Sequence, residues 1–308
     1  MHGSHAYRTN TPDSDMDLRG VAIPPEPYFL GFHSIFEQNI VGQNGSDEDT
    51  VIYDIRKFFK LAVDCNPNVI ELLYVPDRCI QFATTIGEKI LANRDLFLSQ
   101  KAKFKFSGFA MAQMKRMKTH RGWLLSPPNH EPTRAEYGLG PNPELSPVVR
   151  EAIKLLIKSN IDLSRILKEE AVEAYKKERA YHNSVETWSH FLKWRSERNP
   201  ARAKLEAKFG YDTKDAMHLV RVMRMAKEII LTGKVLVERP DREELLAIKH
   251  GAWKYEEILG WADKHDTEIN EIYDDPARNC VLPHTANMNK LENLCVELNK
   301  EFLDFKKV

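Results

Sequence analysis

The chain has 308 residues, of which 42% are hydrophobic and 29% charged, which is ordinary for a globular protein and long enough for two domains. Lysine and arginine number 45, as do aspartate and glutamate, so any nucleic-acid binding must come from a local basic patch. No apolar run reaches the length of a membrane span, and the start lacks a basic-then-apolar leader, so we expect neither a membrane anchor nor secretion. The four scattered cysteines favour reduced core thiols in a cytosolic protein.

The N-terminal segment combines a Gly-Ser turn with an Asp-x-Asp pair. The turn is Gly3-Ser4, and the carboxylates are Asp15 and Asp17, at the entry to a strand expected over residues 18–24. Side chains two apart on a strand share a face, so the two carboxylates can jointly hold Mg²⁺ or Mn²⁺. The backbone N–H groups of the turn and the Ser4 hydroxyl suit phosphate oxygens. Each signal is common alone, but the ordered pair predicts nucleotidyl transfer.

A third acid is expected on a neighbouring strand, because two metal ions about 4 Å apart need more than two carboxylates. Glu71 is the first choice, since it is the only acid in an apolar segment, residues 69–75, that we interpret as a buried strand. A metal would offset the cost of burying its charge. The alternative is an acid at a strand edge or in an ion pair. Asp54, ending a strand expected over residues 50–55, is the second choice.

The pattern after the first strand is mixed and then helical. A turn is expected at residues 42–46. Six prolines over residues 123–148 exclude regular structure and mark a linker. A short strand is expected over residues 234–238. Helices are expected over residues 56–64, 78–93, 96–120, 147–159, 162–195, 213–232 and 287–305, with two or three more within 241–274.

These elements predict an α+β fold with two domains. Residues 1–122 form a small mixed-sheet nucleotidyltransferase domain, residues 123–148 a proline-rich linker, and residues 149–308 a mostly α-helical domain that completes the cleft.

The chain resembles the DNA polymerase beta-like nucleotidyltransferase superfamily, whose signature is Gly-Ser, a short helix and a strand carrying Asp-x-Asp. It looks more closely like a bacterial and phage family of predicted nucleotidyltransferases, the RNA repair pathway polymerase beta family. The resemblance spans about residues 3–270 and includes the segments 66–73, 210–221 and 248–251. It implies catalytic roles for Asp15 and Asp17, a supporting role for Glu71, and nucleotide binding by Gly3 and Ser4.

Two positions depart from the family. Relatives usually carry an apolar strand before the Gly-Ser turn, where only Met1 and His2 stand in this chain. We therefore expect that either the chain is a truncated form or another segment takes that place. The residue after Tyr7 is usually glycine and is Arg8 here.

The helix expected from residue 213 carries Lys214, His218 and Arg221 at positions i, i+4 and i+7, hence on one face. Taken with the resemblance, this face predicts binding of the β- and γ-phosphates of a nucleotide opposite the carboxylates. The alternative is an ordinary solvated face paired with acids.

Residues 101–123 contain seven basic residues, interleaved aromatics and no acid. Lys115, Arg116, Lys118 and Arg121 are the candidates for contact with polynucleotide phosphates. The alternative is an amphipathic helix whose aromatics are core and whose basic residues are solvated.

The sequence thus predicts a Mg²⁺-dependent nucleotidyltransferase that moves a nucleoside monophosphate from an NTP to an acceptor hydroxyl, with RNA, tRNA included, as the acceptor. Asp15, Asp17 and Glu71 would hold the metals. Two alternatives stay open: nucleotidylation of a partner protein, as in antitoxin-like enzymes, and a catalytically weak NTP- or RNA-binding protein. We expect the protein in the cytoplasm, or in the host cytoplasm if it is phage-encoded, and the sequence does not indicate its oligomeric state.

Overall fold

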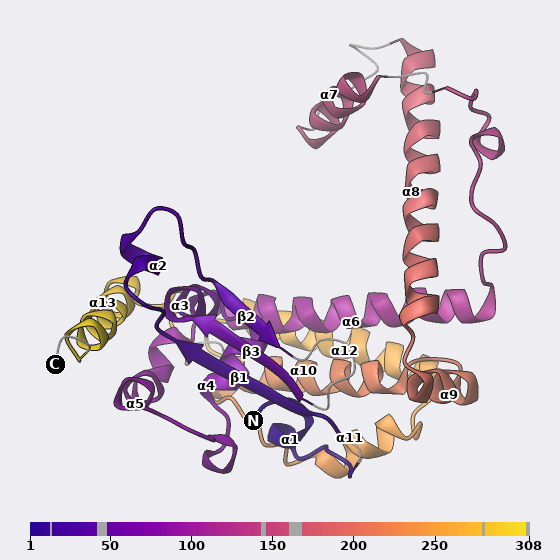
Figure 1. Cartoon of the computed structure of the whole chain (residues 1–308). Helices are drawn as coiled ribbons and strands as arrows, with labels where there is room; N and C mark the ends of the chain where they lie inside the picture. Colours follow the sequence, from indigo (N-terminus) through magenta and orange to yellow (C-terminus); the bar gives the residue numbers. More distant parts are fainter. Residues whose placement is uncertain (13, 42–47, 143–145, 160–167, 279–280, 306–308) are drawn as a thin grey trace. The chain divides into compact units, whose positions relative to one another are not determined.

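The computed structural model describes the chain apart from residues 13, 42–47, 143–145, 160–167, 279–280 and 306–308 (Figure 1). The chain divides into two compact units. The first contains Met1–Lys118 and Tyr211–Val308, and the second contains Thr119–Gly210. The C-terminal helices therefore group with the N-terminal sheet, whereas the predicted domain boundaries at residues 122 and 148 stay predictions. None of the helices in the described parts is long and apolar enough to cross a membrane.

A three-stranded mixed sheet forms the β part of the first unit (Figure 1). Its order is β1 (Met16–Ala22), β3 (Glu48–Asp54), β2 (Gln38–Val41). The β1–β3 pair is parallel and the β2–β3 pair antiparallel. The predicted α+β class is confirmed, as are the first two expected strands to within two residues. The turn expected at residues 42–46 lies outside the described residues, and β2 was not expected.

Two predicted strands are wrong. Glu71 lies in a helix, α4 (Pro67–Leu73), because Asn66 caps its first turn by accepting a hydrogen bond from the Asn68 N–H, and Pro67 suits the first helical position. The apolar run that follows concealed this start signal in the sequence. Residues 234–238 are irregular, although Val235 and Val237 are buried. Apolar runs of this length do not distinguish a strand from other buried segments.

Helix α10 (Thr213–Thr232) forms the centre of the first unit and agrees with the prediction at both ends. Asp212 accepts hydrogen bonds from the N–H groups of Lys214 and Asp215, and Gly233 ends the helix in the left-handed region with φ of +68°. Nearly all of its apolar side chains are buried. It packs on α11 (Arg242–Lys249) and α12 (Tyr255–Asp274), and these two helices agree with the two or three expected within residues 241–274.

The first unit contains further helices. The helix expected over residues 78–93 is shorter, because a 3₁₀ helix, Asp77–Cys79, and an irregular stretch precede it. The remaining helices are α1 (Gly3–Tyr7), α2 (Pro27–Leu30), α3 (Ile55–Val63), α5 (Thr85–Ala92), a second 3₁₀ helix (Arg94–Phe97), α13 (Met288–Phe305) and the start of α6 (Lys101–Leu125).

The second unit contains the end of α6, a 3₁₀ helix (Arg134–Tyr137), α7 (Pro147–Lys158), α8 (Glu169–Glu197) and α9 (Pro200–Phe209). Helix α8 is its longest element (Figure 1). Aromatic side chains pack helices of this unit against one another: Trp194 contacts Trp123 and Phe191, and Phe191 contacts Trp188. These aromatic contacts hold α8 against the end of α6.

Candidate functional site

The Gly-Ser turn lies directly against Asp17. Gly3 has φ of +61°, and a Cβ atom at this position would lie 1.9 Å from the Asp17 Oδ2 atom. The His2 N–H donates to the Asp17 carbonyl at 2.8 Å. No larger side chain fits at residue 3 without displacing the carboxylate, so the turn and one carboxylate of the predicted pair are brought together.

The sheet register places a third carboxylate beside Asp17. Asp17 on β1 is the Cα partner of Asp49 on β3, and partners on adjacent strands project from the same face. Burial raises the pKa of Asp17, the nearby Arg19 opposes this rise, and the negative charges of Asp15 and Asp49 add to it. Three acids thus share one region, where like charges disfavour ionisation unless a cation binds.

Asp49 was missed by sequence analysis, because it precedes the expected start of its strand and only the parallel register brings it to Asp17. The acid pair Glu48-Asp49 at a strand entry was the available signal. Within the described ranges, no group of three or more His, Cys, Asp or Glu side chains has an arrangement that could already hold a metal ion.

Two lysines supply positive charge to the same region. Lys214, at the start of α10, acts on Asp17, and Lys249, at the end of α11, interacts with Asp15 and Lys214. Burial lowers the pKa of Lys249, as does the neighbouring Lys214 charge, whereas Asp15 opposes the effect. Thr213 Oγ1 donates to the Lys249 carbonyl at 2.7 Å and so ties the two helix ends together. Lys214 was predicted from the sequence and Lys249 was not.

Glu71 and Arg221 pair with each other. The Arg221 Nη1 atom donates to Glu71 Oε1 at 2.6 Å, and the Tyr7 hydroxyl donates to Glu71 Oε2. The Glu71 side chain is 1% exposed and that of Arg221 4%. His2 Nε2 lies 3.7 Å from Glu71 Oε2, and burial lowers the pKa of His2 to about 4. The metal and phosphate roles predicted for Glu71 and Arg221 stay predictions. In this structure the two side chains form an ion pair with each other.

Asp54, the second choice for the third acid, caps helix α3. Its Oδ1 atom accepts hydrogen bonds from the N–H groups of Arg56 and Lys57, and its carboxylate pairs with the Arg56 guanidinium at 2.9 Å. It stands at the opposite end of β3 from Asp49, where its Cα partner is Ala22.

Ser4 has a buried hydroxyl that makes no hydrogen bond within the part of the chain that the structure describes. A buried hydroxyl without a partner is costly, and a phosphate oxygen would satisfy it. The backbone around it is fixed, since the Thr9 N–H donates to the Ser4 carbonyl at 2.9 Å.

A family match covers the segment that contains this turn and its acids. Residues 1–125 match the RNA repair pathway DNA polymerase beta family. Over these residues the match confirms the resemblance predicted from the sequence. A stretch of 84 residues is 33% identical to an uncharacterized 38.9 kDa protein from the nrdC-mobD intergenic region of Enterobacteria phage T4. That stretch covers 25% of this chain and 25% of the phage protein. No solved structure matches.

The segment that matches the polymerase beta family ends at Leu125, the last residue of the basic helix α6. Arg116 donates to the buried Asp215 carboxylate at 2.7 and 2.8 Å, and Arg121 donates to the Gly210 carbonyl at 2.7 Å. Lys115 and Lys118 are exposed. The helix is amphipathic in part, since Phe106 is fully buried while Phe104 is 52% exposed. The nucleic-acid contacts of these four basic residues stay predictions.

His218 lies on the same face of α10 as Lys214 and is half-buried. Its predicted contact with nucleotide phosphates stays a prediction.

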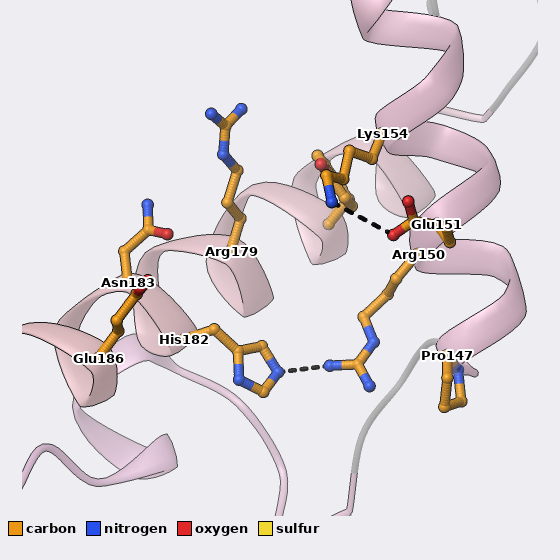
Figure 2. Close-up of a pocket in the computed structure, with 9 residues that line it drawn as sticks. Pro147, Arg150, Glu151, Lys154, Arg179, His182, Asn183 and Glu186 are labelled. Atoms are coloured by element: carbon orange, nitrogen blue, oxygen red, sulfur yellow. Dashed lines mark hydrogen bonds and ion pairs between the residues drawn. The ribbon is translucent and has the colours of Figure 1, made fainter. Parts of the chain in front are cut away.

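The second unit holds a cavity of about 810 Å³ between α7 and α8 (Figure 2). Its charges are mixed, and several are already paired: Arg150 donates to His182, and Lys154 lies 3.5 Å from Glu151. None of the site residues predicted from the sequence lines this cavity. Its acidic and basic residues are Arg150, Glu151, Lys154, Arg179, His182 and Glu186. This balance does not favour a highly charged anion such as a triphosphate.

Proposed function

We propose that the protein is a divalent-metal-dependent nucleotidyltransferase that transfers a nucleoside monophosphate from an NTP to an acceptor hydroxyl and releases pyrophosphate. The observation that carries this proposal is the contact of the Gly-Ser turn with Asp17, whose pKa is raised by burial and by the negative charges of Asp15 and Asp49. The family match over residues 1–125 supports the same reaction class.

Asp15, Asp17 and Asp49 are the residues that would hold Mg²⁺ or Mn²⁺. Carboxylate oxygens are the ligands that these hard cations prefer, and the raised pKa of Asp17 reflects burial among negative charges that a cation would relieve. The bound metal would offset the charge that develops on the attacking and leaving oxygens. In this proposal Asp49 takes the place that the sequence assigned to Glu71.

The triphosphate would bind between the turn and the two lysines. The Ser4 hydroxyl lacks a partner within the described chain, and Lys214 and Lys249 bring two positive charges to the region of Asp15 and Asp17. Binding of a polyanion would relieve the repulsion between the lysines. Cations that neutralise phosphates are a regular requirement of phosphoryl and nucleotidyl transfer.

RNA is the acceptor that we favour, because the matching family is described by an RNA repair pathway. In this proposal Lys115 and Lys118, both exposed on α6, would contact its phosphates. Transfer to a partner protein and nucleotide binding without turnover are the competing outcomes, which the fate of a labelled nucleotide distinguishes.

The variants Asp49→Asn and Asp54→Asn, both on β3, test whether Asp49 holds the metal. The residues lie five positions apart, roughly 16 Å along β3. Asp49→Asn should lower pyrophosphate release about 100-fold or more, since it removes a metal ligand. Asp54→Asn keeps an amide oxygen that can cap α3, so it should cost some stability and leave turnover within a few fold. Equal turnover in both variants would remove Asp49 from the site.

A further inference from the structure

Helix α1 carries the Gly-Ser turn, yet it is only five residues long. A helix of this length has no stability of its own, because the first turn costs more conformational entropy than its few hydrogen bonds recover. Contacts with other elements must therefore hold the turn in place. Near its amino end the His2 N–H bonds to Asp17, and at its carboxyl end Arg78 donates to the carbonyls of His5 and Ala6 at 3.1 and 3.3 Å.

A buried polar cluster of Tyr7, Glu71 and Arg221 joins α1 to α4 and α10. The Tyr7 hydroxyl donates to one Glu71 oxygen while Arg221 donates to the other, and the Arg221 guanidinium lies 3.7 Å from the centre of the Tyr7 ring. Tyr7 is 3% exposed. Each of the three side chains contacts the other two, so the position of Tyr7 is determined by both neighbouring helices at once.

Burial of this ion pair is not explained by stability alone. Removing two charges from water costs several kcal/mol, and apolar residues of similar volume often stabilise a core as well or better. What a buried, hydrogen-bonded ion pair adds is a defined geometry. Both carboxylate oxygens of Glu71 accept from protein donors. This arrangement suits a residue that orients its neighbours better than one that ligates a metal.

We propose that the cluster of Tyr7, Glu71 and Arg221 is a positioning device that fixes the Gly-Ser turn against Asp17. The proposal rests on the proposed function for its catalytic consequence, because the turn matters for turnover only if it binds nucleotide. Glu71 is then a positioning residue that acts through Tyr7.

The variant Tyr7→Phe tests the proposal with the least disturbance, since it removes one hydroxyl and keeps the ring under Arg221. Loss of a hydrogen bond to a charged acceptor would weaken the placement of the turn. The KM for NTP should therefore rise about tenfold while kcat changes less. The Mg²⁺ concentration for half-maximal activity should stay the same. The matched control is Tyr74→Phe, which removes a tyrosine hydroxyl that donates to Asp95 at 2.6 Å, outside the cluster. It should leave KM unchanged.

Hydrogen exchange gives a readout that does not depend on activity. In Tyr7→Phe, the amides of His2 and Thr9, which bond to Asp17 and Ser4, should exchange about tenfold faster, while those of α10 keep their protection. In Tyr74→Phe they should not change. Unchanged exchange at residues 2–9, or faster exchange spread over the whole first unit, would overturn the positioning role.

Glu71→Gln separates positioning from metal binding. If Glu71 is a positioning residue, the KM effects of Tyr7→Phe and Glu71→Gln will not be additive in the double variant. The Mg²⁺ requirement will be unchanged. A shift of the Mg²⁺ requirement in Glu71→Gln alone would overturn the proposal in favour of a metal ligand. If the unaltered protein turns over no NTP while exchange changes only at residues 2–9, the proposed function fails and the positioning role stands.

Discussion

Gly3 shows at the scale of one residue how backbone geometry and site chemistry are linked. Its positive φ and its contact with the Asp17 carboxylate both exclude a side chain. Gly3 and Asp17 lie fourteen residues apart in the sequence, and the fold brings them into contact.

The variant Gly3→Ala should therefore affect both stability and activity. An alanine at this φ is strained by about 1 to 3 kcal/mol, and its Cβ must also displace Asp17. We expect a loss of turnover of about 100-fold or more, measured by pyrophosphate release, and a lower midpoint of urea unfolding. Gly108→Ala is the control, because nothing lies within 4 Å of a Cβ at that helical position. It should stabilise the protein by about 0.5 to 1 kcal/mol and leave turnover intact. A fully active Gly3→Ala would contradict the assigned contact.

The sequence could predict the residues whose role follows from a local motif. Gly3, Ser4 and Asp17 belong to one such motif, and the structure brings Gly3 and Asp17 together. Asp49 and Lys249 could not be predicted in this way, because they reach the region only through the register of β3 and the packing of α11 on α10. Pairing across more than thirty residues is a tertiary property that local patterns do not encode.

At the scale of elements, capping signals decided which predictions succeeded. Helix α10 was located to the residue because Asp212 and Gly233 mark its two ends. Helix α4 was mistaken for a strand because the apolar run was weighed above the Asn-Pro pair that opens it. The error changed the meaning of Glu71, which as a helical residue pairs with Arg221 on α10.

Helix α12 carries a pH-sensitive contact that can be measured. His265 stacks on Trp261 with ring centres 3.7 Å apart, and burial lowers its pKa below the usual 6.5. The unfolded chain thus binds a proton at a higher pH than the folded one, so stability should fall as the pH drops below about 6.5. Urea unfolding between pH 7.5 and pH 5.5 should show this loss, and His265→Gln should reduce it. An identical pH dependence in the variant would contradict the assignment.

At the scale of the whole molecule, the candidate site draws on both ends of the sequence. The family match covers residues 1–125, while Lys214, Arg221 and Lys249 come from the C-terminal helices of the same compact unit. The turn, its acids, its lysines and its buried support therefore form one structure built from segments far apart in the chain.

The central claim is nucleotidyl transfer, and a turnover measurement on the full chain tests it most directly. Each of the four NTPs, labelled on the α-phosphate, is incubated with mixed RNA, with and without Mg²⁺, and both pyrophosphate and the labelled product are followed. We predict Mg²⁺-dependent pyrophosphate release from at least one NTP, with the label in RNA, and loss of both in an Asp15→Ala, Asp17→Ala double variant. No release from any of the four NTPs, or full activity in the double variant, would contradict the account.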